Sequence, residues 1–306
     1  MKQGFVKVAS ATPGIRVADP VYNARAICTQ AKEAAEHGAK IIVFPELCIT
    51  GYTCNDLFLQ NLLLKKAKEA LLTIAEETSR LGALLFVGLP VEKDGRLYNV
   101  AAAVYRGSIL GMIPKKNIPT YAEFYEGRYF TSGEERITNF RLGEYEVPFG
   151  TNLLFCCEEL PELVLGCEIC EDLWVADPPS TSHALAGATV IANLSASNET
   201  VSKDAYRELL VKSTSARLLC GYIYTSAGEG ESTQDLVFGG HNLIAENGTL
   251  LAQSSRFATG ILYTDLDVFK ISSERRRMGT FGKRPTVSYC KIPFSMELTE
   301  TKLERK

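Results

Sequence analysis

The sequence predicts a mixed α/β domain in which two β-sheets pack against each other and helices cover their outer faces. Three observations support this prediction: a strand–helix–strand pattern at the start, an antiparallel run of three strands after it, and interleaved helices and strands in the second half. The 306 residues are 46% apolar and 23% charged, which is the composition of a globular domain with a large core.

The chain begins with a strand, a helix and a second strand. Residues 4–12 alternate between apolar and polar side chains, as a half-buried strand does. A helix is predicted over residues 18–38, because Asp19 can cap it, small apolar residues recur at helical spacing and Gly38 can end it. Residues 40–44 are almost wholly apolar and predict a short strand that is buried on both faces.

A further helix and an antiparallel meander follow. Residues 83–114 hold three apolar runs separated by Asp94-Gly95 and Arg106-Gly107. Those dipeptides are typical of hairpin turns, so the segment predicts three antiparallel strands. Before it, residues 56–80 predict a helix whose core positions are leucines: Leu57, Leu62, Leu63, Leu64, Leu71 and Leu72.

The second half interleaves strands and helices, and its pattern fades after about residue 270. We expect a domain over residues 1–270, with residues 271–306 as a tail or as the start of a linker to a further domain. The predicted elements are strands over residues 162–170 and 188–197, a helix over 204–220, and a hairpin over 240–255 that turns at Asn247-Gly248.

Composition and charge argue against several classes of function. The net charge of −3 argues against nucleic-acid binding, and we interpret the basic run Arg275–Arg277 as a solvated loop. No stretch reaches the ~20 apolar residues of a membrane span, and the first residues lack the apolar core of a signal peptide. The nine cysteines form no framework, so we expect reduced thiols and a cytoplasmic location.

The stretch LGCEICEDLW, residues 165–174, poses the central chemical question. Its cysteines, Cys167 and Cys170, have the CxxC spacing of redox pairs and zinc sites. A redox pair is disfavoured, because Glu168, Glu171 and Asp172 oppose thiolate formation and because residues 167 and 170 of one strand point to opposite faces. Zinc is disfavoured too, because one CxxC and three isolated histidines supply no tetrahedral ligand set.

The remaining interpretation is that one of the two cysteines is a nucleophile and the other has no chemical role. We interpret Cys167 as a buried core thiol. Cys170 stands where the apolar strand ends and a polar turn begins, which is the position of a nucleophile elbow, but a second buried thiol would fit the pattern equally well. A cysteine nucleophile also needs a base and an oxyanion donor.

Two other stretches offer those groups. Glu46 follows a buried strand directly after Pro45, where partial desolvation favours a base, although an exposed loop glutamate is the alternative. Lys115 and Lys116 follow a strand and begin a long, aromatic-rich loop, and such loops in compact domains are often functional. Either lysine can equally face the solvent.

Together these stretches resemble the nitrilase superfamily of carbon–nitrogen hydrolases. FPELCITGY resembles the family's glutamate motif, PKKNIPTYAEFYEGRYFTSG its lysine segment and GCEICEDLW its cysteine motif, in the family's order, over about residues 5–270. The resemblance implies a four-layer α-β-β-α sandwich with mixed sheets and a catalytic triad of Glu46, Lys115 and Cys170. It selects Lys115 over Lys116 and adds Glu126 as a supporting glutamate.

Further stretches narrow the resemblance to one branch. PTYAEFYE, CEDLW, NLSAS and SAGEGESTQDLVFGGHNLIAENG resemble the glutaminase domains of glutamine-dependent NAD synthetases. In that branch, ammonia from glutamine passes to an ATP-dependent synthetase domain with a pyrophosphate loop of SGGxDS type. No such loop occurs in these 306 residues. We therefore expect an isolated domain, either cut from a longer chain or free-standing, that does not make NAD by itself.

The resemblance also implies a role for each site residue. Cys170 attacks the side-chain amide of glutamine, Glu46 acts as base and acid, and Lys115 with the backbone N–H of Glu171 holds the oxyanion. A carboxylate such as Glu171 can also meet the α-ammonium of the substrate. The residues that bind the amino-acid end of glutamine would be Tyr121, Ser197 and Lys203; some relatives carry arginine at the last position.

The implied partners follow from the same branch. The glutaminase reaction needs no cofactor and no metal, whereas ATP and Mg belong to the absent synthetase domain. We expect glutamine, a synthetase domain and other copies of the same chain as partners, and neither nucleic acid nor membrane. The alternatives are an amidase or nitrilase of the same superfamily that acts on another small amide, and a non-catalytic interaction domain.

Overall fold

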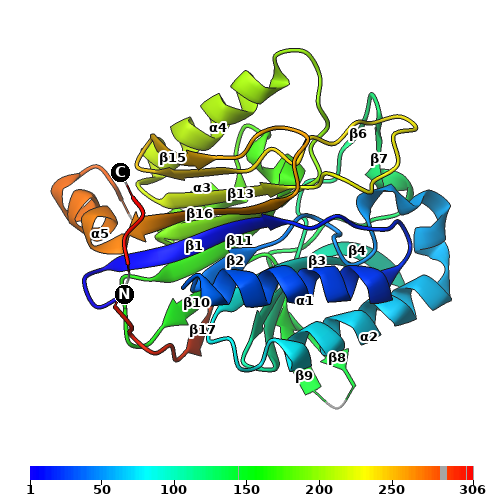
Figure 1. Cartoon of the computed structure of the whole chain (residues 1–306), viewed down its shortest axis with the longest axis horizontal. Helices are drawn as coiled ribbons and strands as arrows, with labels where there is room; N and C mark the ends of the chain where they lie inside the picture. Colours follow the sequence, from blue (N-terminus) through cyan, green and yellow to red (C-terminus); the bar gives the residue numbers. More distant parts are fainter. Residues whose placement is uncertain (144, 283–287, 301, 306) are drawn as a thin grey trace.

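Two mixed β-sheets pack face to face in the computed structural model, which describes residues 1–143, 145–282, 288–300 and 302–305 (Figure 1). The spatial order of the first sheet is β16 (Gly260–Asp267), β1 (Phe5–Thr12), β2 (Ile41–Val43), β3 (Leu84–Lys93), β4 (Arg96–Tyr105), β5 (Ser108–Pro114), β9 (Tyr145–Phe149) and β8 (Thr138–Leu142). The order of the second is β15 (Thr249–Gln253), β14 (Leu243–Glu246), β13 (Gly221–Ser226), β12 (Val190–Ser195), β11 (Val164–Ile169), β10 (Leu153–Cys157) and β17 (Cys290–Phe294).

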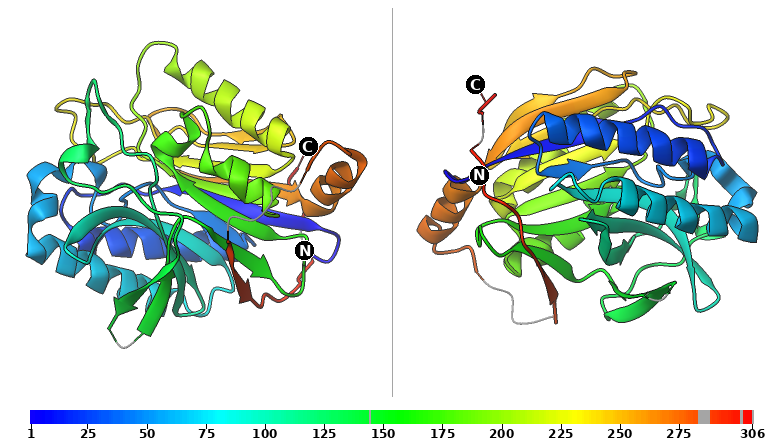
Figure 2. Two further views of the ribbon diagram at one scale, coloured as in Figure 1. Left: turned by 180° about the vertical axis from the view of Figure 1, so that it is seen from behind. Right: turned by 60° about the horizontal axis from the view of Figure 1, so that its bottom comes forward.

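Helices cover the outer face of each sheet. Two lie side by side on the first sheet, and two others pack on the second (Figures 1 and 2). A separate apolar core fills the space between the sheets, where the Phe86 and Phe155 rings meet at 5.6 Å. The predicted α-β-β-α sandwich with mixed sheets is therefore confirmed. The helices are α1 (Pro20–Glu36) and α2 (Asn61–Glu77) on the first sheet, α3 (Pro179–Leu185) and α4 (Lys203–Leu218) on the second, and α5 (Val268–Arg277) at one end.

Local sequence rules account for several boundaries. The Asp19 carboxylate accepts a hydrogen bond from the Tyr22 N–H at 3.0 Å and caps α1 as predicted. Gly38, with φ +93°, follows the end of α1. Both residues of each predicted hairpin dipeptide have positive φ, as type I′ turns require. Those dipeptides are Asp94-Gly95, Arg106-Gly107 and Asn247-Gly248.

The helix predicted over residues 56–80 is two elements, and half of its predicted core positions are wrong. A 3₁₀ segment, η1 (Tyr52–Leu59), precedes α2, and the break between them resets the helical phase. Leu62 and Leu72 then lie on the stripe of charged α2 residues that faces the solvent. Leu57, Leu62 and Leu72 are exposed, while Leu63, Leu64 and Leu71 are buried as predicted.

The segment after residue 270 differs from the expected tail. Arg275, expected to be solvated, donates hydrogen bonds to three carbonyl groups at the end of α4 and beside it, those of Leu218, Leu219 and Ala188. β17 pairs in parallel with β10 and completes the second sheet. The five residues of β17 alternate apolar side chains with Lys291 and Pro293, but so short a run does not identify a strand by itself, and the strand depends on the backbone partners that β10 supplies. In the described residues, no helix is long and apolar enough to cross a membrane.

Candidate active site

The candidate site lies at one edge of the two sheets, where several strands end. Lys115 directly follows β5 and Cys170 directly follows β11, while Glu46 and Ser197 come two or three residues after β2 and β12. The Glu46 N–H donates to the Ser195 carbonyl at 3.3 Å, which ties the two sheets together at this edge. The sandwich thus gathers side chains that are far apart in the sequence, as the carboxyl ends of strands commonly do.

A close backbone approach fixes Glu46. The turn after β2 passes so near to β3 that a Cβ atom on Gly88 would lie 2.3 Å from the Leu47 nitrogen, so only glycine fits there. The Glu46 carboxylate is 1% exposed and accepts three hydrogen bonds. They come from Lys115 Nζ at 2.7 Å and Asn99 Nδ2 at 2.7 Å to Oε1, and from the Ala196 N–H at 2.9 Å to Oε2.

Lys115 lies between two carboxylates. Its Nζ is 2.7 Å from Glu46 Oε1 and 2.6 Å from Glu126 Oε1, and the side chain is fully buried. Burial lowers the pKa of Lys115, but Glu126 and Glu46 outweigh that effect and hold its pKa well above the usual value. Burial raises the pKa of Glu126 to about 7, against the opposing effect of Lys115. Lys115 is therefore an ammonium at neutral pH.

Cys170 occupies a strained turn beside this pair. Its φ of +47° lies in the left-handed region, which β11 enters as it passes into the 3₁₀ turn η3 (Cys170–Leu173). Burial and then Glu46 raise the pKa of Cys170, and Lys115 lowers it only in part. The residue is thus a thiol at neutral pH, and a base must remove its proton before it can act as a nucleophile.

The structure differs from the expectation that Cys167 and Cys170 point to opposite faces of one strand. β11 ends at Ile169, so Cys170 belongs to the turn, and both cysteines contribute to the core between the sheets. Both are free thiols. Burial, followed by Glu168 and Asp172, raises the pKa of Cys167 well above the usual value, as expected for an inert core thiol.

The three carboxylates near the cysteines accept hydrogen bonds from different parts of the molecule. Glu168 lies on the helix side of the second sheet and accepts from the Tyr222 hydroxyl and the Ser180 N–H. Asp172 accepts from the backbone and side chain of Asn117, both at 2.8 Å, and so ties the lysine loop to the cysteine turn. Glu171 is half-buried and accepts from the exposed Tyr121 hydroxyl at 2.9 Å, which brings two predicted substrate residues together.

The remaining predicted residues form a second group around the start of α4. Ser197 is buried just after β12, and Lys203 is the first residue of α4. Lys203 Nζ donates to Asn198 Oδ1 and lies 5.0 Å from the centre of the Trp174 ring. Burial lowers the pKa of Lys203, while Cys170 and nearby carboxylates act in the other direction.

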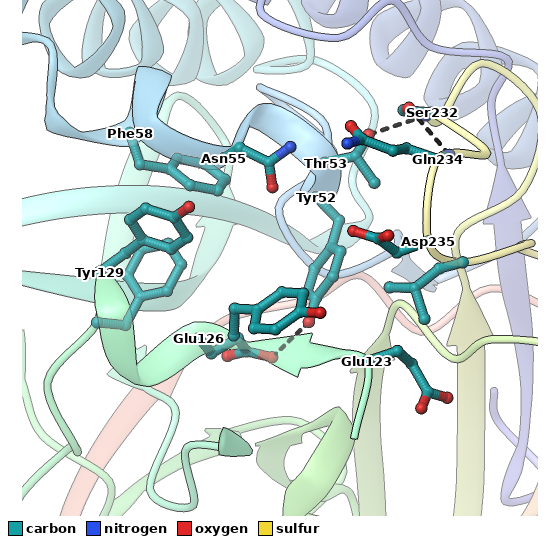
Figure 3. A pocket seen from close by; sticks show the side chains of 13 residues that line it. Tyr52, Thr53, Asn55, Phe58, Glu123, Glu126, Tyr129, Ser232, Gln234 and Asp235 are labelled. Carbon is teal, nitrogen blue, oxygen red and sulfur yellow. Dashed lines mark hydrogen bonds between the residues drawn. The ribbon is translucent and has the colours of Figure 1, made fainter. Parts of the chain in front are cut away.

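A pocket adjoins the Lys115 cluster through two of its wall residues. In Figure 3 the Tyr52 hydroxyl points to the Glu126 carboxylate, with which it forms a 2.9 Å hydrogen bond. Glu123 and Asp235 add further carboxylates to the wall, and aromatic side chains supply much of the remainder. Because Glu126 also holds Lys115, the pocket is connected to the reaction centre by direct contacts.

Sequence reasoning missed several residues of the site. Asn99 Nδ2 donates to Glu46 at 2.7 Å and to Glu126 at 3.4 Å. Its only sign in the sequence was that an amide side chain interrupts the apolar run of β4. Arg207 is fully buried and donates to Ser197 Oγ. Its helical spacing from Val211 and Leu218 could have placed it on the buried face of α4.

Within the part of the chain that the structure describes, two of the three histidines make no contact with these groups, and the third, His241, contacts Arg207 at 2.8 Å. His183 and His241 are buried, and burial lowers the pKa of each to about 4, so both are neutral at physiological pH. His183 contacts the Cys167 carbonyl, and the half-exposed His37 lies 2.7 Å from the Glu304 carboxylate. Among the described residues, no group of three or more histidine, cysteine, aspartate or glutamate side chains is arranged to hold a metal ion.

A buried glutamate–lysine pair beside a strained cysteine, at the strand ends of an α-β-β-α sandwich, defines the class of a carbon–nitrogen hydrolase. A family model described as carbon-nitrogen hydrolase matches residues 7–276, and the chain belongs to that family. The predicted nitrilase-superfamily resemblance is therefore confirmed.

Curated relatives show which members of this family the chain resembles. The glutamine-dependent NAD(+) synthetase of Mycobacterium tuberculosis is 44% identical over 304 residues, which is 97% of this chain and 45% of that protein. The one from Aquifex aeolicus is 33% identical over 249 residues, with 79% of this chain and 40% of that protein covered. The chain thus spans about half the length of the curated relatives that it matches.

Solved structures agree with this picture. A glutamine-dependent NAD(+) synthetase from Cytophaga hutchinsonii is 30% identical with a TM-score of 0.77, and the match covers 86% of this chain and 43% of that one. An amidase of the nitrilase superfamily from Nesterenkonia is 21% identical with a TM-score of 0.68, and the match covers 89% and 94% of the two chains. The second likeness concerns the fold alone.

Proposed function

We propose that this chain is a glutaminase domain, which hydrolyses the side-chain amide of glutamine and supplies ammonia for the amidation of deamido-NAD by a synthetase domain. The observation that carries the proposal is the buried ammonium of Lys115, shared by Glu46 and Glu126 beside a strained cysteine. The likeness to glutamine-dependent NAD(+) synthetases over 97% of the chain supports glutamine as the substrate.

In the first step the Cys170 thiol attacks the amide carbon of glutamine. Because the thiol keeps its proton at neutral pH, Glu46 must accept that proton as the C–S bond forms. Glu46 Oε2 suits this role, since the Ala196 N–H holds it at 2.9 Å while Oε1 is occupied by Lys115 and Asn99.

The negative charge that develops on the amide oxygen needs donors. An ammonium has three N–H donors, and Lys115 directs two of them to Glu46 and Glu126, so one is left for the oxyanion. The backbone N–H of Glu171, at the start of the turn after β11, is the second proposed donor. Buried donors that are fixed before the reaction stabilise such charge strongly.

The second half of the reaction reuses the same base. Glu46 gives its proton to the departing nitrogen, which leaves as ammonia while the C–N bond breaks and the thioester remains. Water then attacks the thioester while Glu46 takes a proton from it. The C–S bond breaks, Glu46 returns that proton to the sulfur, and glutamate leaves as the thiol is restored. Every atom is accounted for without ATP, so the glutaminase reaction needs no phosphoryl transfer.

Selectivity for glutamine is assigned to the residues around α4 and the turn after β11. Lys203 and Ser197 suit the α-carboxylate, while Tyr121 and Glu171 suit the α-ammonium. A simple amide would leave buried Ser197 and partly buried Lys203 without this partner, at a cost of about 1–3 kcal/mol each. Glutamine should therefore react at least about tenfold faster than propionamide in kcat/KM.

The test is ammonia release from glutamine, asparagine and propionamide by the purified chain without ATP. We expect glutamine to be preferred, with asparagine poor because its shorter side chain cannot reach Cys170 while its α-groups stay bound. Equal rates on glutamine and propionamide would replace this proposal with that of a general amidase. No hydrolysis, together with a Cys170 that resists alkylation, would favour a non-catalytic domain. The homo-oligomer and the cytoplasmic location remain predictions.

A further inference from the structure

Arg207 is one of the largest fully buried side chains of the described residues, and it lies one helical turn after Lys203 on α4. A buried guanidinium costs several kcal/mol unless hydrogen bonds and charge offset its desolvation. Arg207 makes contacts that converge on the segment just after β12. Its partners are Glu199 Oε1 at 2.7 Å, His241 Nδ1 at 2.8 Å, the Asn198 carbonyl at 3.0 Å and Ser197 Oγ at 3.2 Å.

The contact with Ser197 fixes the direction of a hydroxyl group. A guanidinium has donors only, so Ser197 Oγ must accept in the 3.2 Å contact with Arg207 Nη2. The single hydrogen of the serine then points elsewhere, and no hydrogen bond donated by this hydroxyl occurs among the described residues, so it is available to a ligand. Arg207 thereby prepares Ser197 to donate a hydrogen bond, which is what an incoming carboxylate requires.

The charge around this segment is mixed, because cations at the start of α4 lie among the carboxylates of Glu199 and Asp204. Lys203 and Arg207 place two cations within the first two turns of α4, where the helix N-terminus adds partial positive charge. Glu199 pairs with Arg207, but its second oxygen, like Arg207 Nε, has no partner among the described residues. The Asn198 side chain links Lys203 to Glu123, so the Arg207 contact to the Asn198 carbonyl also holds the lysine in place.

We propose that Arg207 is the positioning residue for the α-carboxylate of the substrate: it directs the Ser197 hydroxyl and anchors the segment that holds Lys203. This inference rests on the glutaminase function proposed above and deepens it. Arg207 acts through Ser197 and Asn198 and has no part in the bond-breaking steps. Its removal should therefore weaken binding of substrates that carry the α-carboxylate and leave the chemistry at Cys170 intact.

The test compares glutamine with 4-aminobutanamide, which is glutamine without its α-carboxylate. The variant is Arg207→Met combined with Glu199→Gln, so that no unpaired charge stays buried. We expect KM for glutamine to rise at least about tenfold with kcat within about threefold, and kcat/KM for 4-aminobutanamide to change by less than about threefold. Because Arg207 acts partly through Ser197, adding Ser197→Ala to this variant should have less than its usual effect.

Arg275→Met is the matched control, because Arg275 is a partly buried arginine that binds carbonyl groups at the other end of α4. It should lower the melting temperature without changing the preference for glutamine over 4-aminobutanamide. Equal losses on both substrates in the Arg207 variant, or the same loss of preference in Arg275→Met, would overturn the inference and leave the glutaminase proposal standing. A wild-type chain that hydrolyses 4-aminobutanamide as well as glutamine would overturn both.

Discussion

The reaction centre and the amino-acid end of the candidate site are built in different ways. In the centre, every charged oxygen and nitrogen of Glu46, Lys115 and Glu126 has a hydrogen-bond partner. At the amino-acid end, Arg207 and Glu199 each keep a buried polar atom without a partner among the described residues. The charged groups of the centre are thus all paired before substrate arrives, and only the neutral Asn99 Oδ1 there lacks a partner among the described residues, whereas charged groups at the amino-acid end keep unused hydrogen-bonding atoms.

Because the two regions are built differently, we expect substitutions in them to change different kinetic constants. Groups that act on the reacting bond change kcat, while groups that hold a remote part of the substrate change KM. We therefore expect substitutions in the centre to reduce kcat on every amide. Substitutions around α4 should change the preference among amides. The following predictions test this separation, beginning with the largest expected effect.

Cys170→Ala should lower kcat by about 10³-fold or more on every amide, because no other nucleophile lies in the strained turn after β11. The matched control is Cys167→Ala, which removes the same atom from the same core. That variant should keep most of the activity and lose only some stability, since Cys167 is fully buried. The measurements are ammonia release and thermal unfolding, and equal losses of activity in both variants would revive a paired role for the cysteines.

Lys115→Met should lower kcat by about 10²–10³-fold, because it removes the proposed oxyanion donor. It should also destabilise the protein by about 3–5 kcal/mol, since two carboxylates stay buried without their cation. Lys116→Met is the control: its half-exposed pair with Glu135 is worth at most about 1 kcal/mol. Denaturant unfolding and kinetics on glutamine measure both effects, and similar behaviour of the two variants would contradict the assignment of Lys115.

The same comparison explains how much of the molecule could be predicted. Glu46, Lys115 and Cys170 each follow a strand that is recognisable from its apolar run, and the family resemblance selected them and preferred Lys115 to Lys116. Only the structure placed the three strand ends at one edge. The branch resemblance added Tyr121, Ser197 and Lys203, whose surroundings the pattern did not describe. Arg207 was not predicted because an arginine on a helix is usually exposed. Its burial is tolerable only through four hydrogen-bond partners, of which three lie at residues 197–199, just before α4, and the fourth is His241.

Elements whose stability depends on distant partners were missed as well. β17 forms against β10, more than 130 residues away in the sequence, and its short alternating run, CKIPF, lies in the stretch that was expected to be a tail or linker. The strand before Cys170 was predicted one residue too long, so the two cysteines were wrongly expected on opposite faces, because a left-handed φ at a non-glycine residue cannot be read from composition. Short local rules, such as the cap of α1 and the hairpin dipeptides, held because they need only neighbouring residues.

Ser197→Ala should have a smaller effect than the two substitutions in the centre. The loss of one buried hydrogen bond to a charged group is worth about 1.5–3 kcal/mol, so KM for glutamine should rise about tenfold or more. The kcat on 4-aminobutanamide should stay within about twofold. Ser213→Ala, on the exposed face of α4, should change neither value. A fall in kcat on both amides would place Ser197 in the reaction centre and erase the boundary between the two regions.

The last expected effect concerns the stability of the reaction centre and leaves the preference among amides aside. Burial raises the pKa of Glu126 from 4.5 to about 7, so the folded state holds a proton that the unfolded state releases between these values. The resulting stability is complete below about pH 4.5 and is lost as the pH rises through 7. Glu126→Gln removes this dependence, so the stability difference between wild type and variant should fall by up to about 1.4 kcal/mol per pH unit in that range.

Other groups titrate in the same range, but they cancel in the comparison. Burial raises the pKa of Glu168 to about 7 as well, while the lowered pKa values of His183 and His241 make stability rise with pH between about 4 and 6.5. These contributions are the same in the wild type and in Glu126→Gln, so the difference in stability between them reports on Glu126 alone. Urea unfolding at several pH values between 5 and 8 measures it. Parallel curves would mean that Glu126 stays ionised throughout, and that Lys115 stabilises its charge more than burial opposes it.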